Sequence, residues 1–169
     1  MTLMLASVTN PAEAEAVWAG GADIIDLKDP AKGALGALDA DVAAGIVRSV
    51  GKRRPVSAAA GASLGAPWEV VDAVAAMAAT GVDYVKVGFS PGKAGADCVR
   101  ALGPHASNTK LVGVLFADAR PIWICWRSWP ITVLPAPCSI PPKKERGVYS
   151  IKWISPRSIA LSTGAGRTD

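Results

Sequence analysis

Short apolar runs alternate with alanine-rich segments over the first 120 residues, and this alternation leaves few folds open to the chain. The expected strands are 3–7, 23–28, a third beginning at 55–58, 83–87 and 110–116. The expected helices are 11–19, one that follows Asp39 and runs to about 50, 67–79 and 94–102. A helix between consecutive strands indicates a parallel sheet, because parallel strands need long crossover connections. A doubly wound sheet shows the same alternation, so both it and five βα-type units from the N-terminal part of a (β/α)8 TIM barrel stay open at this point.

Local signals mark the ends of these elements. Asn10 suits the N-cap of the first helix, with Pro11 at its first helical position. Gly20 and Gly21 suit its end. Asp39 is expected to cap the second helix. The triplets Gly21-Ala22-Asp23 and Gly81-Val82-Asp83 each precede a strand and suggest internal repetition.

The composition changes abruptly after Pro121. The last 49 residues hold four of the six tryptophans, seven of the thirteen prolines and only three alanines. Residues 1–120 carry 11 Lys and Arg against 12 Asp and Glu, a net of −1, whereas 121–169 carry 7 against 2, a net of +5. We therefore divide the chain into residues 1–120, the front part of a barrel domain, and residues 121–169, an irregular or disordered tail that is not native to it.

A shift of reading frame explains this tail. When the third base of each codon is read with the first two of the next, 122–130 together with the adjoining bases of codons 121 and 131 can encode DLDLLAKLAD, an amphipathic helix, and 137–144 can encode MLDTAKK. Loss of one base in the Pro121 codon is sufficient to produce the change. We expect a chain truncated in this way to be impaired, because an open half-barrel leaves strand edges and apolar faces exposed, which favours misfolding or aggregation and loss of activity.

Several function classes fit this sequence poorly. The basic residues are scattered among prolines and tryptophans rather than gathered on a nucleic-acid-binding module. Arg127 and three prolines interrupt the longest apolar stretch, 122–140, so a membrane span is not expected. The three cysteines show neither metal-ligand spacing nor an even-numbered disulfide framework. We therefore expect a cytoplasmic protein with reduced thiols, no metal, no cofactor, and no nucleic-acid or membrane partner.

Two lysines and a carboxylate are the strongest candidates for chemistry. Asp26 and Lys28 are two residues apart on one expected strand, so their side chains share a face. Lys86 has the matching place on the fourth strand, and alternate strands of a barrel contribute to a common interior layer. Nearby ammonium groups depress one another's pKa, and a free amine attacks a carbonyl to form a Schiff base. The second lysine can then move protons, and Asp26 can orient the first lysine or carry a proton.

Other interpretations of these residues stay open. Lysines at strand ends are commonly solvated charges without a function. Ser7 ends the first strand and Asp118 follows the fifth, so both could line the same mouth and bind substrate. Each of these two residue types is also common in caps and turns.

The stretch from Ala19 to Gly36, which contains GGADIIDLKDP, closely resembles the (5-formylfuran-3-yl)methyl phosphate synthase family. Residues 81–88 resemble its second signature, and 116–119 its third. The resemblance implies a (β/α)8 barrel that condenses two molecules of glyceraldehyde 3-phosphate, with loss of phosphate and water, for methanofuran-type cofactors. It also implies that Lys28 is the Schiff-base lysine, Lys86 the proton-transferring lysine and Asp26 an active-site carboxylate.

The chain departs from this family in two places. Residues 57–62 lack the acidic residue expected after the glycine, and an LDTA-type motif with its Asp and Lys is absent unless the frame is restored. The alternatives are a class I Schiff-base aldolase acting on a phosphorylated sugar, and an inactive product of a damaged gene. In either enzymatic case the partner is a phosphorylated small molecule. We expect homo-oligomers only if the full frame is restored.

Overall fold

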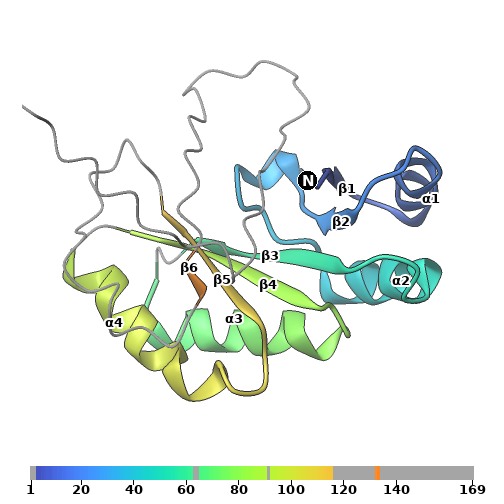
Figure 1. Cartoon of the computed structure of the whole chain (residues 1–169). Helices are drawn as coiled ribbons and strands as arrows, with labels where there is room; N and C mark the ends of the chain where they lie inside the picture. Colours follow the sequence, from blue (N-terminus) through green and yellow to red (C-terminus); the bar gives the residue numbers. More distant parts are fainter. Residues whose placement is uncertain (1–2, 63–64, 91, 116–131, 134–169) are drawn as a thin grey trace, which may run out of the picture.

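The computed structural model describes residues 3–62, 65–90, 92–115 and 132–133 (Figure 1). Six parallel strands form one sheet in the order β1-β2-β3-β4-β5-β6. The strands are β1 (Leu5–Val8), β2 (Ile24–Leu27), β3 (Val56–Ala62), β4 (Tyr84–Phe89), β5 (Leu111–Leu115) and β6 (Thr132–Val133). The helices are α1 (Pro11–Ala19), α2 (Ala40–Val50), α3 (Pro67–Ala79) and α4 (Lys93–Leu102), with short 3-10 turns η1 (Pro30–Lys32) and η2 (Gly103–His105).

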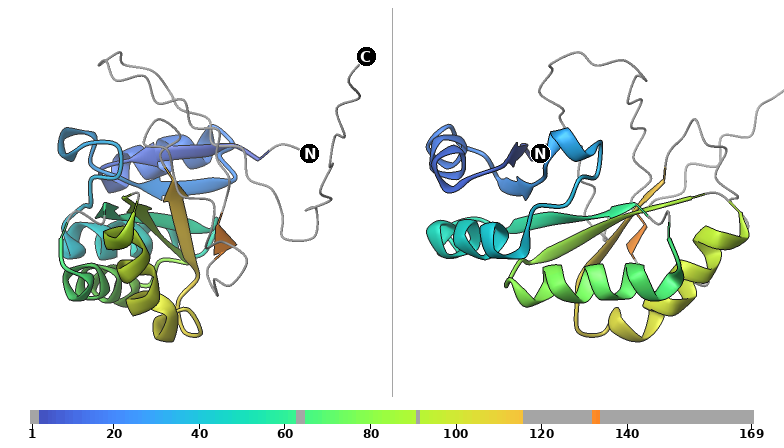
Figure 2. Two further views of the ribbon diagram at one scale, coloured as in Figure 1. Left: turned by 90° about the vertical axis from the view of Figure 1, so that its left-hand side faces the viewer. Right: turned by 180° about the vertical axis from the view of Figure 1, so that it is seen from behind.

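The strand order distinguishes between the two architectures that the sequence left open. In a doubly wound sheet the order of strands reverses at a switch point, whereas here consecutive strands are neighbours throughout. The four helices also lie on one side of the curved sheet, with α1 beside α2 and α3 beside α4 (Figures 1 and 2). The described part is therefore the beginning of a (β/α)8 barrel, as the sequence predicted.

The outer face of the sheet carries the hydrophobic core. Alternate strand residues pack against the helices there, because successive side chains of a strand point to opposite faces. The cluster draws on every helix from α1 to α4. Its strand members are Val8, Ile25, Leu27, Val56, Ala58, Val85, Val87, Phe89 and Leu111. The other set of alternate residues faces the interior of the barrel and contains the polar side chains described below.

The two glycine-containing triplets have the same structure at the starts of β2 and β4. Gly21 and Gly81 have φ values of 89° and 88°, a conformation that favours glycine. The Asp23 carboxylate accepts a hydrogen bond from the Met4 N–H at 2.8 Å, and the Asp83 carboxylate accepts one from the Val56 N–H at 2.8 Å. The repetition suggested by the sequence is thus confirmed: in each triplet the aspartate before one strand accepts a hydrogen bond from the backbone at the start of the strand before it.

Most expected boundaries agree with the structure to within one or two residues. The Asn10 side chain caps α1 by accepting from the Glu13 N–H at 2.9 Å. Asp39 occupies the N-cap position of α2 as expected, but its side chain makes no capping hydrogen bond and instead lies 3.3 Å from Lys32 Nζ. The expected loop after β2 contains η1. No described helix is both long and apolar enough to cross a membrane.

Of the proposed tail, the structure describes only Thr132–Val133. These two residues pair in parallel with β5, with Thr132 opposite Val112 and Val133 opposite Gly113. A strand was not expected in this segment. The division of the chain at residue 120 stays a prediction.

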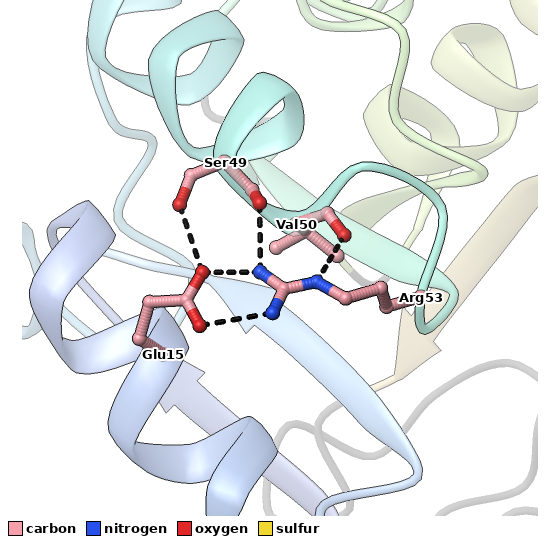
Figure 3. Close-up of polar contacts among 4 residues, drawn as sticks. All are labelled: Glu15, Ser49, Val50 and Arg53. Atoms are coloured by element: carbon pink, nitrogen blue, oxygen red, sulfur yellow. Dashed lines mark hydrogen bonds and ion pairs between the residues drawn. The ribbon is translucent and has the colours of Figure 1, made fainter.

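A polar cluster joins α1 to the end of α2 (Figure 3). Arg53 stands between α2 and the start of β3, whereas Lys28 follows the carboxyl end of β2. Arg53 donates to Val50 O at 2.9 Å, to Ser49 O at 2.8 Å and to both carboxylate oxygens of Glu15. Its guanidinium also lies 4.0 Å from the centroid of the Trp18 ring. The hydrogen bond from Arg53 lowers the pKa of Glu15 below its ordinary value, and in turn Glu15 raises the pKa of Arg53.

Candidate active site at the carboxyl ends of the strands

Asp26 lies at the centre of a polar group on the inner face of the sheet. It is 1% exposed and belongs to β2, where the strand register places it between Ser7 of β1 and Ser57 of β3. Ser7 Oγ donates to Asp26 Oδ2 at 3.1 Å, and Ser57 Oγ donates to Oδ1 at 2.6 Å. Lys86 of β4 places Nζ 2.5 Å from the same Oδ1. Side chains from β1, β3 and β4 therefore converge on one carboxylate.

Lys86 is buried, with 3% of its surface exposed. The interpretation of this lysine as a solvated charge at a strand end is therefore wrong. Burying an unpaired ammonium in a protein interior is costly, so buried charges are normally paired. Asp26 supplies the opposite charge here, and the two hydroxyl groups satisfy further acceptor positions of the carboxylate.

Lys28 follows β2 directly and is only partly buried. Its N–H donates to Val8 O at 3.2 Å, so the backbone still pairs with β1 at this position. Continued strand alternation places residue 28 on the same face as Asp26. The register extended by one residue puts Lys28 beside Ala59, and Ala59 pairs with Lys86. The two lysines thus lie at the same level along the strands. They stand on strands separated by β3, so their backbones are roughly 10 Å apart.

The loop after Lys28 is tightly closed by backbone contacts. The Asp29 N–H donates to Gly36 O at 2.9 Å, and the Asp29 carboxylate accepts from the Ala31 N–H at 2.9 Å. A Cβ atom on Gly36 would lie 2.1 Å from Asp29 O, which is far too close. Glycine at 36 therefore lets the loop fold back on the residue that follows Lys28.

The structure brings together three of the five predicted site residues by direct contact: Ser7, Asp26 and Lys86. Lys28 lies at the same end of the sheet, and Asp118 lies outside the described residues. Ser7 lies within β1 and is exposed, unlike Asp26.

Ser57 was missed as a site residue. A polar residue at an inward position of a strand otherwise made of Val, Ala and Gly was the available signal.

This arrangement suits the chemistry of carbonyl compounds. Lys28 supplies a primary amine on a partly buried side chain, and Lys86 offers a second nitrogen held against an anion. Lys28 follows the carboxyl end of β2, the side of the sheet where the active sites of (β/α)8 enzymes form, and Lys86 lies inside β4 at the level of Lys28. Amine attack on an aldehyde followed by proton transfer needs groups of these two kinds close together.

Comparison with solved structures supports the fold. A lyase/mutase of Burkholderia cenocepacia superposes with a TM-score of 0.54 at 18% identity, over 67% of this chain and 48% of that one. A dihydrodipicolinate synthase superposes with a TM-score of 0.55 at 16% identity, over 70% of this chain and 47% of that one. At these identities the likeness concerns the fold alone.

Comparison of sequences is more specific. A protein of Methylorubrum extorquens assigned as a (5-formylfuran-3-yl)methyl phosphate synthase is 44% identical over 117 residues, covering 68% of this chain and 47% of that protein. The synthase of Methanopyrus kandleri is 38% identical over 123 residues, covering 69% and 52%. The chain thus spans about half the length of these relatives. The profile of the 4-HFC-P synthase family matches residues 4–125, and the chain belongs to that family.

Proposed function

We propose that this chain derives from an enzyme that condenses two molecules of glyceraldehyde 3-phosphate into (5-formylfuran-3-yl)methyl phosphate through a Schiff base on Lys28. The observation that carries the proposal is the buried ion pair between Asp26 and Lys86 inside the sheet, with Lys86 at the level of Lys28, which follows the carboxyl end of β2. The relatives' names supply the product. The product would serve a methanofuran-type cofactor in the cytoplasm.

The two lysines would divide the work by their surroundings. The Lys28 nitrogen adds to the aldehyde carbon while the aldehyde oxygen takes up a proton, and loss of water then leaves a C=N bond. Lys86, paired with Asp26, would give or receive the protons of these steps. Asp26 serves as the fixed counter-ion of Lys86.

The same proposal includes the loss of the full condensation reaction in this chain. We infer that the missing base in the Pro121 codon separates residues 1–120 from the remaining strands of the barrel. The family match supports this inference, because it ends at residue 125. Formation of the Schiff base needs only the front part of the barrel, whereas the full condensation would need the restored frame.

Trapping with borohydride tests the first step in the chain as written. The protein is incubated with glyceraldehyde 3-phosphate and sodium borohydride, and the modified peptide is identified by mass spectrometry. We expect the reduced adduct on Lys28 and its loss in Lys28→Met. Lys32→Met changes a nearby exposed lysine and serves as the matched control, which should still be labelled on Lys28. An adduct that persists in Lys28→Met would contradict the assignment.

The product identifies the reaction. The gene with the base restored at the Pro121 codon is expressed, and its product from glyceraldehyde 3-phosphate is analysed. A furan aldehyde supports the synthase, and an aldol would support the class I aldolase instead. A repaired protein that forms a product, beside a chain as written that forms neither adduct nor product, would identify this chain as the inactive product of a damaged gene. Sequencing the DNA at this codon without finding a missing base would refute the shift of frame.

A further inference from the structure

Ser57 makes a short hydrogen bond beneath the ion pair. Its side chain is fully buried, and Oγ lies 2.6 Å from Asp26 Oδ1. The same oxygen lies 2.5 Å from Lys86 Nζ. A carboxylate oxygen has two lone pairs, so these two donors occupy both sites of Oδ1. On the other side of β2, Ser7 Oγ of β1 donates a hydrogen bond to Asp26 Oδ2 at 3.1 Å.

Packing alone does not require a hydroxyl group at this position. The residues on either side of Ser57 in β3 are Val56 and Ala58, and the next inward position is Ala59. Alanine at 57 would fill nearly the same volume without burying a polar group. A buried hydroxyl is costly unless it is hydrogen-bonded, and Ser57 meets that requirement through Asp26.

We propose that Ser57 is a positioning residue of the active site, which fixes the Asp26 carboxylate so that Oδ1 faces Lys86. Of the two hydroxyl contacts to Asp26 among the described residues, loss of Ser57 would leave the one from Ser7 to Oδ2. The Asp26 carboxylate could then rotate about its side-chain bond. Lys86 would then lose a partner of fixed orientation. The significance of this contact for catalysis rests on the proposed function, but the contact itself can be tested without turnover.

Chemical labelling of Lys86 measures the effect in the full chain. The protein is treated briefly with acetic anhydride, and acetylation at Lys86 is quantified by peptide mass spectrometry against the exposed Lys93 as internal reference. Ser57→Ala should raise acetylation of Lys86 roughly tenfold, the scale expected for a lost hydrogen bond to a charged group. Ser57→Thr keeps the hydroxyl and should restore protection. Ser107→Ala removes an exposed hydroxyl elsewhere and should change nothing.

A second probe separates positioning from folding. Cys98 is fully buried in the core on the outer face, so its reaction with iodoacetamide reports loosening of the fold. The proposal requires Cys98 to stay protected in Ser57→Ala while Lys86 becomes reactive. Unchanged Lys86 would overturn the proposal. An equal rise in the labelling of Lys86 and Cys98 in Ser57→Ala would also overturn it. The same holds if Lys86 loses protection in Ser57→Thr while Cys98 stays protected.

The trapping experiment keeps the two proposals distinguishable. If wild-type protein forms no adduct on Lys28, the proposed function fails, but the labelling of Lys86 still decides the role of Ser57. If the adduct forms, Ser57→Ala should lower its yield roughly tenfold relative to Ser107→Ala, because Lys86 is no longer held in place. An equal yield in these two variants would contradict the link from Ser57 to the reaction.

Discussion

Replacing Lys86 with methionine removes one partner of the buried ion pair and leaves the other without its counter-ion. Asp26 is 1% exposed, so water cannot take the place of the lysine. Removing one partner of a buried pair typically costs about 3–5 kcal/mol of stability. The hydroxyl groups of Ser7 and Ser57 still donate to the carboxylate, which places the expected cost near the lower end, about 3 kcal/mol.

Urea unfolding followed by far-UV circular dichroism at pH 7 measures this cost. With a slope of about 2 kcal/mol per molar urea, the midpoint should fall by roughly 1.5 M. Lys93→Met is the matched control, since Lys93 pairs with Asp97 on the surface with 87% of its side chain exposed, and it should not move the midpoint measurably.

A double-mutant cycle checks the physical reason. Asp26→Asn should also destabilise the protein, because it leaves the buried Lys86 ammonium without a counter-ion. The double variant Asp26→Asn/Lys86→Met has neither charge, so its cost should be smaller than the sum of the single costs by about 2 kcal/mol. Additive costs, or a Lys86→Met variant as stable as Lys93→Met, would refute the pairing.

Three further changes test other parts of the structure. Asn10→Ala removes the cap of α1 and should cost about 1 kcal/mol in the same urea assay. Arg53 lowers the pKa of Glu15, so this contact stabilises the protein above pH 4.5 and is lost as the pH falls through the lowered pKa. Glu15→Gln should therefore lower the urea midpoint at pH 7, with the difference disappearing in acid, and a constant difference at all pH values would exclude this cause. Gly36→Ala should displace the loop after β2 and reduce borohydride trapping several-fold, whereas trapping at the wild-type level would show that the loop tolerates the added Cβ.

The candidate site was only partly predictable. Asp26, Lys28 and Lys86 could be found because each is a charged residue within or directly after an otherwise apolar run, where polar residues are informative. Which groups touch could not be predicted, because cross-strand neighbours depend on register and not on sequence separation. Spacing drew attention to Asp26 with Lys28, whereas the structure shows Asp26 in contact with Lys86, 60 positions away, and with Ser57. Ser57 went unnoticed because serine is common and its partner lies on another strand.

The sequence by itself determined the local elements and the α/β class. Asn10 before Pro11, the glycines at 20 and 21, and the alternating apolar runs act through neighbouring residues, and the helices and strands form close to where these signals stand. Only the tertiary structure decided between a barrel and a doubly wound sheet. Strands and helices alternate along the chain in the same way in both folds, and the two differ only in the order of strands within the sheet. It also decided that Lys86 is buried and paired rather than solvated, since burial and pairing depend on strands that meet only after folding.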